Sequence, residues 1–291
     1  MMFEGVFTAL ITPFRDGGVD EPALRELIEQ QIAAGISGLV PCGSTGESAT
    51  LSVEEHHQVI EIVIGAAAGR VPVLAGTGSN NTREAIGFTQ HAKDAGAAGA
   101  LLLSPYYNKP TQQGLVEHFL AIADETQFPL VLYNIPGRTA SNVVPETIAR
   151  LAEHEFIVGV KEACGDIDQI AQVIASCPDD FAVLSGDDSF LLPVLALGGK
   201  GSIAVTSNIA PKAMLSLYQS YLSGDVDRAR EIHYELLPLF NALFCETNPI
   251  PVKAALALLG TIADDIRLPL TQLTQPNRDR LQAVLKEAGI L

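Results

Sequence analysis

Eight short apolar runs alternate along this chain with longer segments of helical periodicity. Most of the runs are continuously apolar rather than alternating, as expected for parallel strands that are covered on both faces. Between the runs, apolar residues recur three and four positions apart, which is the period of an amphipathic helix. The eight predicted strands are Val6–Ile11, Gly38–Pro41, Val71–Ala75, Ala100–Leu103, Leu130–Asn134, Ile157–Lys161, Ala182–Ser185 and Gly201–Val205.

Eight strand–helix units predict an α/β fold, a (β/α)8 TIM barrel. An open, doubly wound sheet is the competing fold, but it would normally carry a glycine-rich nucleotide loop after its first strand, and Thr8–Pro13 is not such a loop. We expect a catalytic barrel domain over residues 1–224 and a C-terminal helical extension over residues 225–291. The helical patterns of this extension are Asp225–Cys245, Ile250–Leu259 and Asn277–Glu287.

Local signals mark where several of the helices begin. Ser52–Glu55 has the spacing of a capping box, and so does Asn81–Glu84. Asp166 is suited to cap the helix that follows it, and Pro145 is suited to a first helical turn. These signals predict helix starts at four places between the expected strands.

Charge and residue spacing exclude several classes of function. The net charge is −16, so the basic patch of a nucleic-acid binder is not expected. No apolar run approaches the ~18 residues of a membrane span, and the N-terminus lacks a signal-peptide pattern. The six histidines show no metal-ligand spacing, and the four cysteines form no CxxC pair. We therefore expect a cytoplasmic protein with no metal and no nucleic-acid or membrane partner.

Lys161 ends one of the apolar runs, at the end of a barrel strand where active sites form. Lysine is rarely buried without a partner or a task. Desolvation disfavours the charged form of a buried amine, and a neutral amine can attack a carbonyl to form a Schiff base. The alternative is that Lys161 only marks the point at which the strand reaches solvent.

Other strand ends carry further candidates. Tyr133 suits a general acid or base, or a core aromatic with a satisfied hydroxyl. Arg138 suits a carboxylate clamp, or a surface ion pair. The Gly43–Gly46 turn, with the hydroxyls of Ser44 and Thr45, suits a carboxylate site, or is a plain tight turn. Because the carboxyl ends of barrel strands share one mouth, their convergence favours the catalytic interpretation of Lys161.

Three motifs together resemble the pyruvate-dependent, lysine Schiff-base aldolase family, which includes N-acetylneuraminate lyase and the dipicolinate synthases. They are Gly43–Glu47, Tyr133–Pro136 and Val160–Glu162, and the resemblance extends over essentially the whole chain. Three more motifs resemble the dipicolinate synthase branch: Tyr106–Pro110, Gly137–Thr139 and Asn248–Lys253. One departure is Ser44, where synthases often have threonine; the hydroxyl is kept.

The resemblance implies a lyase that carries out a class I aldol condensation. Pyruvate would condense with L-aspartate-4-semialdehyde to 4-hydroxy-tetrahydrodipicolinate, the committed step of diaminopimelate and lysine biosynthesis. No cofactor is implied beyond a covalent pyruvate imine on Lys161. The alternatives are another aldolase of the family, acting on sialic acid or a keto-deoxy sugar acid, and a barrel-derived small-molecule sensor. The sensor is disfavoured because Lys161 and Tyr133 are both intact.

The same resemblance implies a role for each matching position. Tyr133 would relay protons, linked through Thr45 or Ser44 to Tyr107 of a neighbouring subunit in a homotetramer, a dimer of dimers. Arg138 would bind the carboxylate of aspartate semialdehyde. The positions expected at the substrates are Thr45, Arg138, Gly186 and Ile203.

L-Lysine is the expected feedback inhibitor, at a subunit interface. Val53 stands where lysine-sensitive bacterial members often have histidine, so we expect weak or partial inhibition. The matching positions are Ser48, Ala49, Val53, His56, Asn80, Glu84 and Tyr106.

Overall fold

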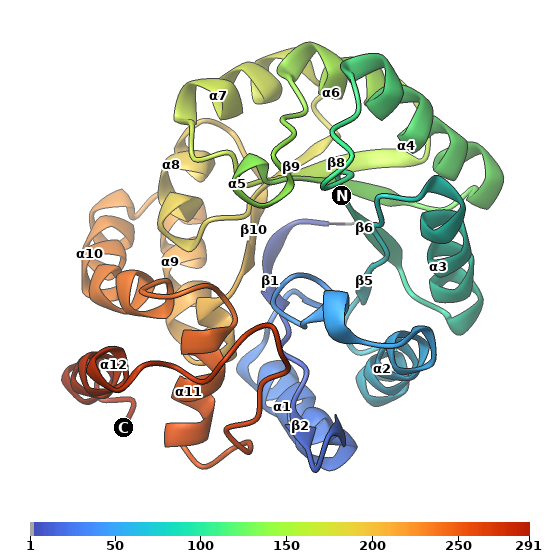
Figure 1. Cartoon of the computed structure of the whole chain (residues 1–291). Helices are drawn as coiled ribbons and strands as arrows, with labels where there is room; N and C mark the ends of the chain where they lie inside the picture. The colour runs from blue at the N-terminus through green and yellow to red at the C-terminus, as the bar shows by residue number, and fades with distance from the viewer. Residues whose placement is uncertain (1–2) are drawn as a thin grey trace. The chain divides into compact units, whose positions relative to one another are not determined.

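The chain folds as a (β/α)8 barrel, as the eight apolar runs predict. The computed structural model describes residues 3–291; Met1 and Met2, where the predicted barrel domain begins, lie outside the described residues. Figure 1 colours the strands and helices in their order along the chain, from blue at the N-terminus to red at the C-terminus. The strands are β1 (Gly5–Ala9), β4 (Gly38–Val40), β5 (Leu74–Gly76), β6 (Gly99–Leu103), β7 (Leu130–Asn134), β8 (Ile157–Glu162), β9 (Ala182–Ser185) and β10 (Gly201–Ala204).

The eight strands belong to one sheet, in the order β4-β1-β10-β9-β8-β7-β6-β5. Within this sheet, each strand pair with a defined register is parallel. A parallel bridge joins Leu39 of β4 to Val73, the residue before β5, and the Leu39 N–H donates to the Pro72 carbonyl at 3.0 Å. The two ends of the strand order therefore meet, as barrel closure requires.

A helix follows every barrel strand. These helices are α1 (Glu21–Ala34), α2 (Val53–Ala67), α3 (Thr82–Ala95), α4 (Gln112–Thr126), α6 (Pro145–Leu151), α7 (Ile167–Ser176), α8 (Leu191–Ala196) and α9 (Pro211–Leu222). Shorter turns are the one-turn helix α5 (Pro136–Thr139) and the 3-10 segments η1 (Ser48–Thr50), η2 (Asp188–Phe190) and η3 (Thr206–Asn208).

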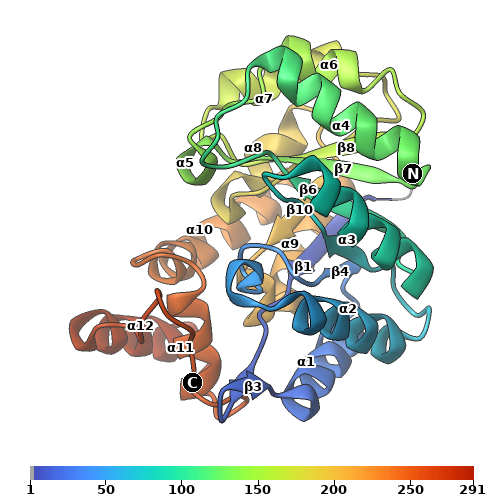
Figure 2. The same cartoon turned by 45° about the vertical axis from the view of Figure 1, so that its right-hand side comes forward.

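The chain forms two compact units, and the first contains Leu74–Ile203 together with the N-terminal residues up to Gly5. Its apolar core joins the strands to the inner faces of their helices. Phe119 of α4, Ile148 of α6 and Val160 of β8 are fully buried members of this core. Figure 2 shows α4 and α6 on the same side of β7 and β8. This burial holds the strand ends that carry Tyr133 and Lys161.

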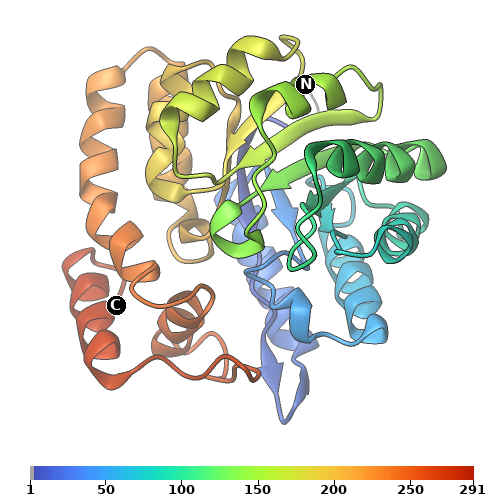
Figure 3. The same ribbon diagram turned by 45° about the horizontal axis from the view of Figure 1, so that its top comes forward.

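The second unit contains Val6–Val73 and Ala204–Leu291. It includes the predicted C-terminal helical extension, α10 (Val226–Leu243), α11 (Ile250–Leu258) and α12 (Gln275–Glu287). Helix α10 packs along α9, and α12 packs against both α10 and α11 (Figure 3). The predicted domain boundary at residue 224 falls between α9 and α10.

Most of the predicted helix starts are confirmed. Ser52 and Glu55 form a capping box at α2, Asp166 caps α7, and Pro145 lies in the first turn of α6. The capping box predicted at Asn81–Glu84 is wrong in its second half. Asn81 does cap α3, but the carboxylate of Glu84 accepts a hydrogen bond from the Ser79 hydroxyl instead of from the Asn81 backbone. The Ser79 hydroxyl thus takes the place of the Asn81 N–H as the donor to the Glu84 carboxylate.

The largest differences from the predicted strands lie in the third strand and in a hairpin after the first strand; the bounds of most other strands differ by one or two residues. The strand predicted at Val71–Ala75 begins only at Leu74, because it is preceded by Pro72, which has no N–H to donate to a ladder. The hairpin of β2 (Phe14–Arg15) and β3 (Gly18–Val19) was not predicted. Its turn residues Asp16 and Gly17 both have positive φ, 54° and 85°. An Asp-Gly pair is a strong signal for such a turn, so the sequence did carry this information.

Candidate active site

Lys161 and Tyr133 lie side by side on neighbouring strands. The register of β7 with β8 pairs Tyr133 with Lys161, so the two side chains leave the sheet on the same face. The Lys161 Nζ lies 4.3 Å from the centroid of the Tyr133 ring. Both residues are only 5% exposed. The amine is thus buried against an aromatic face, with a phenol group from the adjacent strand beside it.

Gly186 leaves room for the Lys161 side chain. It follows β9, and its N–H donates to the Glu162 carbonyl at 2.7 Å. A Cβ at this position would lie 3.0 Å from the Lys161 Cε and 2.7 Å from the Ala163 Cβ. A larger residue at 186 would therefore displace the lysine, which places this predicted position in direct contact with the candidate nucleophile.

The opposite face of the same strand pair carries a network of uncharged partners around Glu162. The register also pairs Asn134 with Glu162, and the Asn134 Nδ2 donates to both carboxylate oxygens, at 3.0 and 3.2 Å. The Cys164 N–H and the Gln169 side chain of α7 donate to the same carboxylate. Burial raises the pKa of Glu162, although these donors oppose the shift. The network holds β7 and β8 in the register that brings Tyr133 to Lys161.

Asp187 and Asp188 follow β9 at the same end of the unit. Burial raises the pKa of Asp187, the charge of Lys161 opposes this shift, and the nearby Asp188 adds to it. Asp187 is therefore within electrostatic range of the lysine, although no ion pair between them lies within bonding distance among residues 3–291.

In the second unit, the loop after β4 carries the other predicted group, Ser44 and Thr45. Thr45 is 4% exposed, and its Oγ1 accepts a hydrogen bond of 2.9 Å from the Asn248 Nδ2. Ser44 is half-buried. Gly46 permits the tight turn, because a Cβ there would lie 3.1 Å from the Cys42 nitrogen and 3.2 Å from the Leu10 carbonyl. This loop is therefore a hydrogen-bonded turn in which the Thr45 oxygen accepts a hydrogen bond from Asn248.

The remaining predicted positions of the first unit differ widely in exposure. Ile203 is fully buried on β10. Arg138 is exposed on the one-turn helix α5. Tyr107 has a φ of 71° and is 88% exposed, so its ring projects from the unit.

The residues expected to bind lysine form local groups within each unit. In the first, the Asn80 Nδ2 donates to the Tyr106 carbonyl at 3.2 Å, and the Asn108 Nδ2 donates to the Asn80 carbonyl at 2.8 Å. Glu84 is exposed, and burial together with this carboxylate raises the pKa of Tyr106. In the second unit, Ser48 and Ala49 lie on η1, and His56 is buried on α2.

Neither a metal-binding cluster nor a membrane-spanning helix is present among residues 3–291. No group of three or more His, Cys, Asp or Glu side chains in this range is arranged to hold a metal ion. No helix in the same range combines the length and the apolar character needed to cross a membrane.

The profile of the dihydrodipicolinate synthetase family matches residues 2–288. The chain belongs to this family. It is 57% identical over 291 residues to the 4-hydroxy-tetrahydrodipicolinate synthase of Syntrophobacter fumaroxidans, and both chains are covered completely. The family prediction made from the motifs around Thr45, Tyr133 and Lys161 is therefore confirmed.

Solved structures of the dihydrodipicolinate synthetase family have the same fold. The dihydrodipicolinate synthase of Aquifex aeolicus superimposes with a TM-score of 0.98 at 49% identity, covering 99% of each chain. The enzyme of Cyanidioschyzon merolae, whose structure contains bound lysine, gives a TM-score of 0.97 at 41% identity, covering 100% of this chain and 99% of that one.

Sequence reasoning missed the buried polar groups that surround the family's motifs. The sequence places Asn248, Lys253 and Glu162 within family motifs but predicts no role for them. Asn248 and Lys253 contact partners more than 200 positions earlier in the chain. No local spacing reveals such partners. The one available signal was that the motif in the extension places an asparagine and a lysine within an otherwise apolar stretch.

Proposed function

We propose that this chain catalyses the Schiff-base condensation of pyruvate with L-aspartate-4-semialdehyde to 4-hydroxy-tetrahydrodipicolinate. Family membership and relatives named for this reaction support the proposal. The observation that carries it is the pairing of Lys161 with Tyr133 across β7 and β8. The reaction needs no cofactor beyond the covalent imine. The enzyme would work in the cytoplasm, where the four cysteine thiols, all free here, stay reduced.

Imine formation is the first step. The neutral Lys161 amine attacks the ketone carbon of pyruvate, and loss of water leaves a carbon–nitrogen double bond. Tyr133 would move protons at the reacting nitrogen and oxygen, and the position of its ring against the Lys161 amine supports this role. The family resemblance extends this proton relay to Thr45 or Ser44 and to Tyr107. Thr45, Gly186 and Ile203 would hold the pyruvate.

Condensation and cyclisation complete the reaction. Loss of a methyl proton converts the imine to an enamine, with the imine nitrogen as the electron sink. The enamine carbon attacks the aldehyde of the second substrate, and the aldehyde oxygen takes up a proton to become the product hydroxyl. The substrate's amine then attacks the imine carbon and releases Lys161, which closes the ring. Arg138 would orient the carboxylate of the semialdehyde, since a guanidinium can bind a carboxylate through two hydrogen bonds.

Tyr107 supports the proposal of a homotetramer built as a dimer of dimers. Its side chain is 88% exposed, so it is open to contact with another subunit. The proposed relay assigns Tyr107 to a neighbouring subunit. A protein unable to associate should therefore lose turnover more than it loses imine formation on its own Lys161.

L-Lysine is the proposed regulatory ligand. The exposed carboxylate of Glu84 offers a partner for an ammonium group, and Asn80 is already hydrogen-bonded to the segment that carries Tyr106. The lysine bound to the Cyanidioschyzon merolae enzyme supports this proposal. Val53 removes one polar contact, so affinity should fall by on the order of 1 kcal/mol, or several-fold, without being abolished. Lysine titrations of the initial rate in wild type and in Glu84→Ala test the site: undiminished inhibition in the variant would exclude it.

Borohydride reduction in the presence of pyruvate tests the catalytic proposal. Reduction should fix one pyruvate-derived adduct on Lys161, mapped by mass spectrometry of the peptides. Lys161→Arg should give no adduct and no condensation, because a guanidinium stays protonated. Lys212→Arg is the matched control, since Lys212 is exposed on α9.

The second substrate is tested separately with a panel of aldehydes, followed by the mass of the product. Aspartate semialdehyde should be condensed most efficiently, and Arg138→Ala should impair its use more than it impairs the borohydride adduct. An adduct on a residue other than Lys161 would refute the mechanism. Efficient cleavage of a sialic acid, without use of aspartate semialdehyde, would instead assign this chain's activity to another branch of the Schiff-base aldolases.

A further inference from the structure

The segment that carries Arg138 is a loop whose two ends are joined by one buried side chain. Asn134 is the last residue of β7 and is completely buried. Its Nδ2 donates to the Asn142 Oδ1 at 2.8 Å, and its Oδ1 accepts a hydrogen bond of 3.0 Å from the Val143 N–H. All of these residues belong to the first unit. The loop of residues 135–142 therefore begins and ends at Asn134.

Between these ends, the loop is held together by its own hydrogen bonds. The N–H groups of Arg138 and Thr139 donate to the Ile135 carbonyl at 3.0 and 3.1 Å. The Thr139 hydroxyl donates to the Ser141 carbonyl at 2.8 Å and accepts from the Ser141 N–H at 3.2 Å. Because the loop is bonded internally, the contacts at its base decide where α5 presents the Arg138 side chain.

Asn142 fixes the base of the loop to two helices as well as to β7. Its Nδ2 donates to the Gln169 Oε1 at 2.8 Å, and the Gln169 Nε2 donates back to the Asn142 Oδ1 at 3.1 Å. Gln169 lies on α7. The Asn142 carbonyl accepts a hydrogen bond of 2.7 Å from the Nε2 of Gln112 on α4. The paired hydrogen bonds of the two amides fix the plane of the Asn142 side chain.

Asn142 can be changed without removing the contacts beside Lys161. The Asn134 side chain also donates to Glu162, and this contact holds β7 against β8. Asn142 has no printed contact of its own with that carboxylate; it reaches Glu162 only through Asn134 and Gln169. A substitution at Asn142 therefore loosens the Arg138 loop and leaves the direct bonds between the two strands in place.

We propose that Asn142 is a positioning residue for the second substrate: together with Asn134 it closes the loop that carries Arg138, and so fixes where the guanidinium meets the carboxylate of the aldehyde. The inference rests on the proposed function, which assigns that carboxylate to Arg138. A two-bond guanidinium–carboxylate pair demands exact placement, and a misplacement of about 1 Å can cost on the order of a hundredfold in rate. Imine formation on Lys161 does not use Arg138, so it should not depend on Asn142.

A double-mutant cycle with two readouts tests this role. Wild type, Asn142→Ala, Arg138→Ala and the double variant are compared. Borohydride trapping on Lys161 gives the half-saturating concentration of pyruvate, and steady-state rates at saturating pyruvate give kcat/KM for aspartate semialdehyde. Asn81→Ala is the matched control, because it removes an asparagine that caps α3 and bonds to the Arg83 N–H, outside the Arg138 loop.

In Asn142→Ala, kcat/KM for aspartate semialdehyde should fall about tenfold, since a displaced guanidinium keeps one of its two hydrogen bonds to the carboxylate. The half-saturating concentration of pyruvate should stay within about twofold of wild type. In the Arg138→Ala background, Asn142→Ala should change kcat/KM by less than about twofold, because the group that it positions is gone. Asn81→Ala should match wild type in both readouts.

Several results would overturn the inference alone. Equal losses in trapping and condensation would show that Asn142 acts through general stability. Additive losses in the double variant would show that it does not act through Arg138, and normal condensation by Asn142→Ala beside an impaired Arg138→Ala would leave it no role. Trapping at wild-type pyruvate concentrations shows that a variant is folded around Lys161. Asn142→Ser, which keeps an oxygen at this position, replaces Asn142→Ala in the cycle if the latter does not fold.

Two other results would overturn the proposed function together with this inference. One is a wild type that is labelled on Lys161 but does not condense aspartate semialdehyde. The other is an Arg138→Ala variant that condenses the semialdehyde as well as wild type does. The two kinds of failure are therefore distinguished within the same set of proteins.

Discussion

Two buried lysines, one in each compact unit, have opposite surroundings. Lys253 is 2% exposed and is paired with the carboxylate of Glu47 at 2.6 Å, with the Thr12 carbonyl as a second partner. Lys161 is 5% exposed, and within residues 3–291 its amine has neither a hydrogen bond nor an ion pair; it lies over the Tyr133 ring. Each amine is 4.3 Å from the centroid of an aromatic ring, Phe14 for Lys253 and Tyr133 for Lys161.

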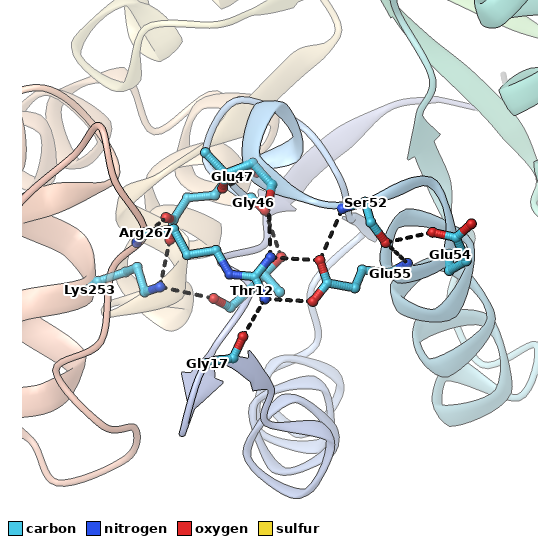
Figure 4. A network of polar contacts seen from close by, with 10 residues as sticks. Thr12, Gly17, Gly46, Glu47, Ser52, Glu54, Glu55, Lys253 and Arg267 are labelled. Atoms are coloured by element: carbon cyan, nitrogen blue, oxygen red, sulfur yellow. Dashed lines mark hydrogen bonds and ion pairs between the residues drawn. The ribbon is translucent and has the colours of Figure 1, made fainter.

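The comparison shows what separates a structural lysine from a reactive one. Burial lowers the pKa of Lys253, and the Glu47 carboxylate opposes this shift through its charge and its hydrogen bond, so the nitrogen of Lys253 is held in an ion pair (Figure 4). The Lys161 amine lies over the Tyr133 ring and is not held in an ion pair within residues 3–291, so its nitrogen can be approached by a carbonyl carbon. Burial and an aromatic neighbour are common to both sites, so the carboxylate partner is the distinguishing feature. Burial raises the pKa of Glu162, the residue after Lys161, and of Asp187, whose shift the charge of Lys161 opposes.

The largest expected effect comes from Lys161→Met. Turnover should fall at least roughly 10³-fold, because the nucleophile is removed. The free energy of unfolding should stay the same or rise, since an amine without an ion-pair partner is replaced by an apolar chain of similar length. Steady-state rates and urea denaturation measure the two quantities. A loss of stability comparable to that of Lys253→Met would remove the distinction between the lysines.

Lys253→Met should destabilise the protein by about 3–5 kcal/mol, because it leaves the Glu47 carboxylate buried without its counter-charge. Lys253→Met combined with Glu47→Gln should recover most of this loss, since no uncompensated charge remains. Urea denaturation of wild type, both single variants and the double variant gives the coupling energy. Additive losses in the double variant would show that the pair does not act as a compensated unit.

A third prediction concerns how the stability of the first unit depends on pH through His118, which is buried on α4. Burial lowers the pKa of His118 to about 4, and its Nδ1 lies 2.9 Å from the Thr82 hydroxyl. Between the ordinary pKa of 6.5 and about 4, the unfolded chain binds more protons than the folded one, so stability falls as the pH falls through this window. His118→Gln should reduce this acid-dependent loss by about 2 kcal/mol. Unfolding free energies at pH 7, 5.5 and 4 that change equally in both proteins would contradict the assignment.

The smallest expected effect is in the second unit, at the ion pair of Glu55 with Arg267. The guanidinium donates at 2.6 and 2.7 Å and lowers the pKa of Glu55 to about 2. This stabilisation is complete above the ordinary pKa of 4.5 and is lost as the pH falls toward 2. Both side chains are partly exposed, so solvent screening limits the contribution to about 1 kcal/mol. Glu55→Gln should be less stable than wild type at pH 7 and equally stable near pH 2; a difference that persists at pH 2 would point to packing instead.

Patterns with a local cause were predictable from the sequence. The eight apolar runs predicted the barrel, because a strand covered on both faces must be apolar along its whole length. Ser52 and Asp166 predicted helix starts, because a capping side chain bonds to backbone only two or three residues away. Lys161 was predictable as a candidate because it is a charged residue at the end of an apolar run, which is also a local feature of the sequence. The position of Lys161 beside Tyr133 followed once the strands were taken as neighbours in a barrel.

Only the tertiary structure decided which polar groups meet. Thr45 and Asn248 are 203 positions apart, and Glu47 and Lys253 are 206 apart. Even over a short separation the outcome was not predictable: the Glu84 carboxylate accepts a hydrogen bond from Ser79, five positions earlier, and does not complete the predicted capping box. Periodicity reports which face of an element is apolar, but not which of several donors reaches a given acceptor. That choice depends on distances of about 3 Å between side chains, which packing of the whole chain determines.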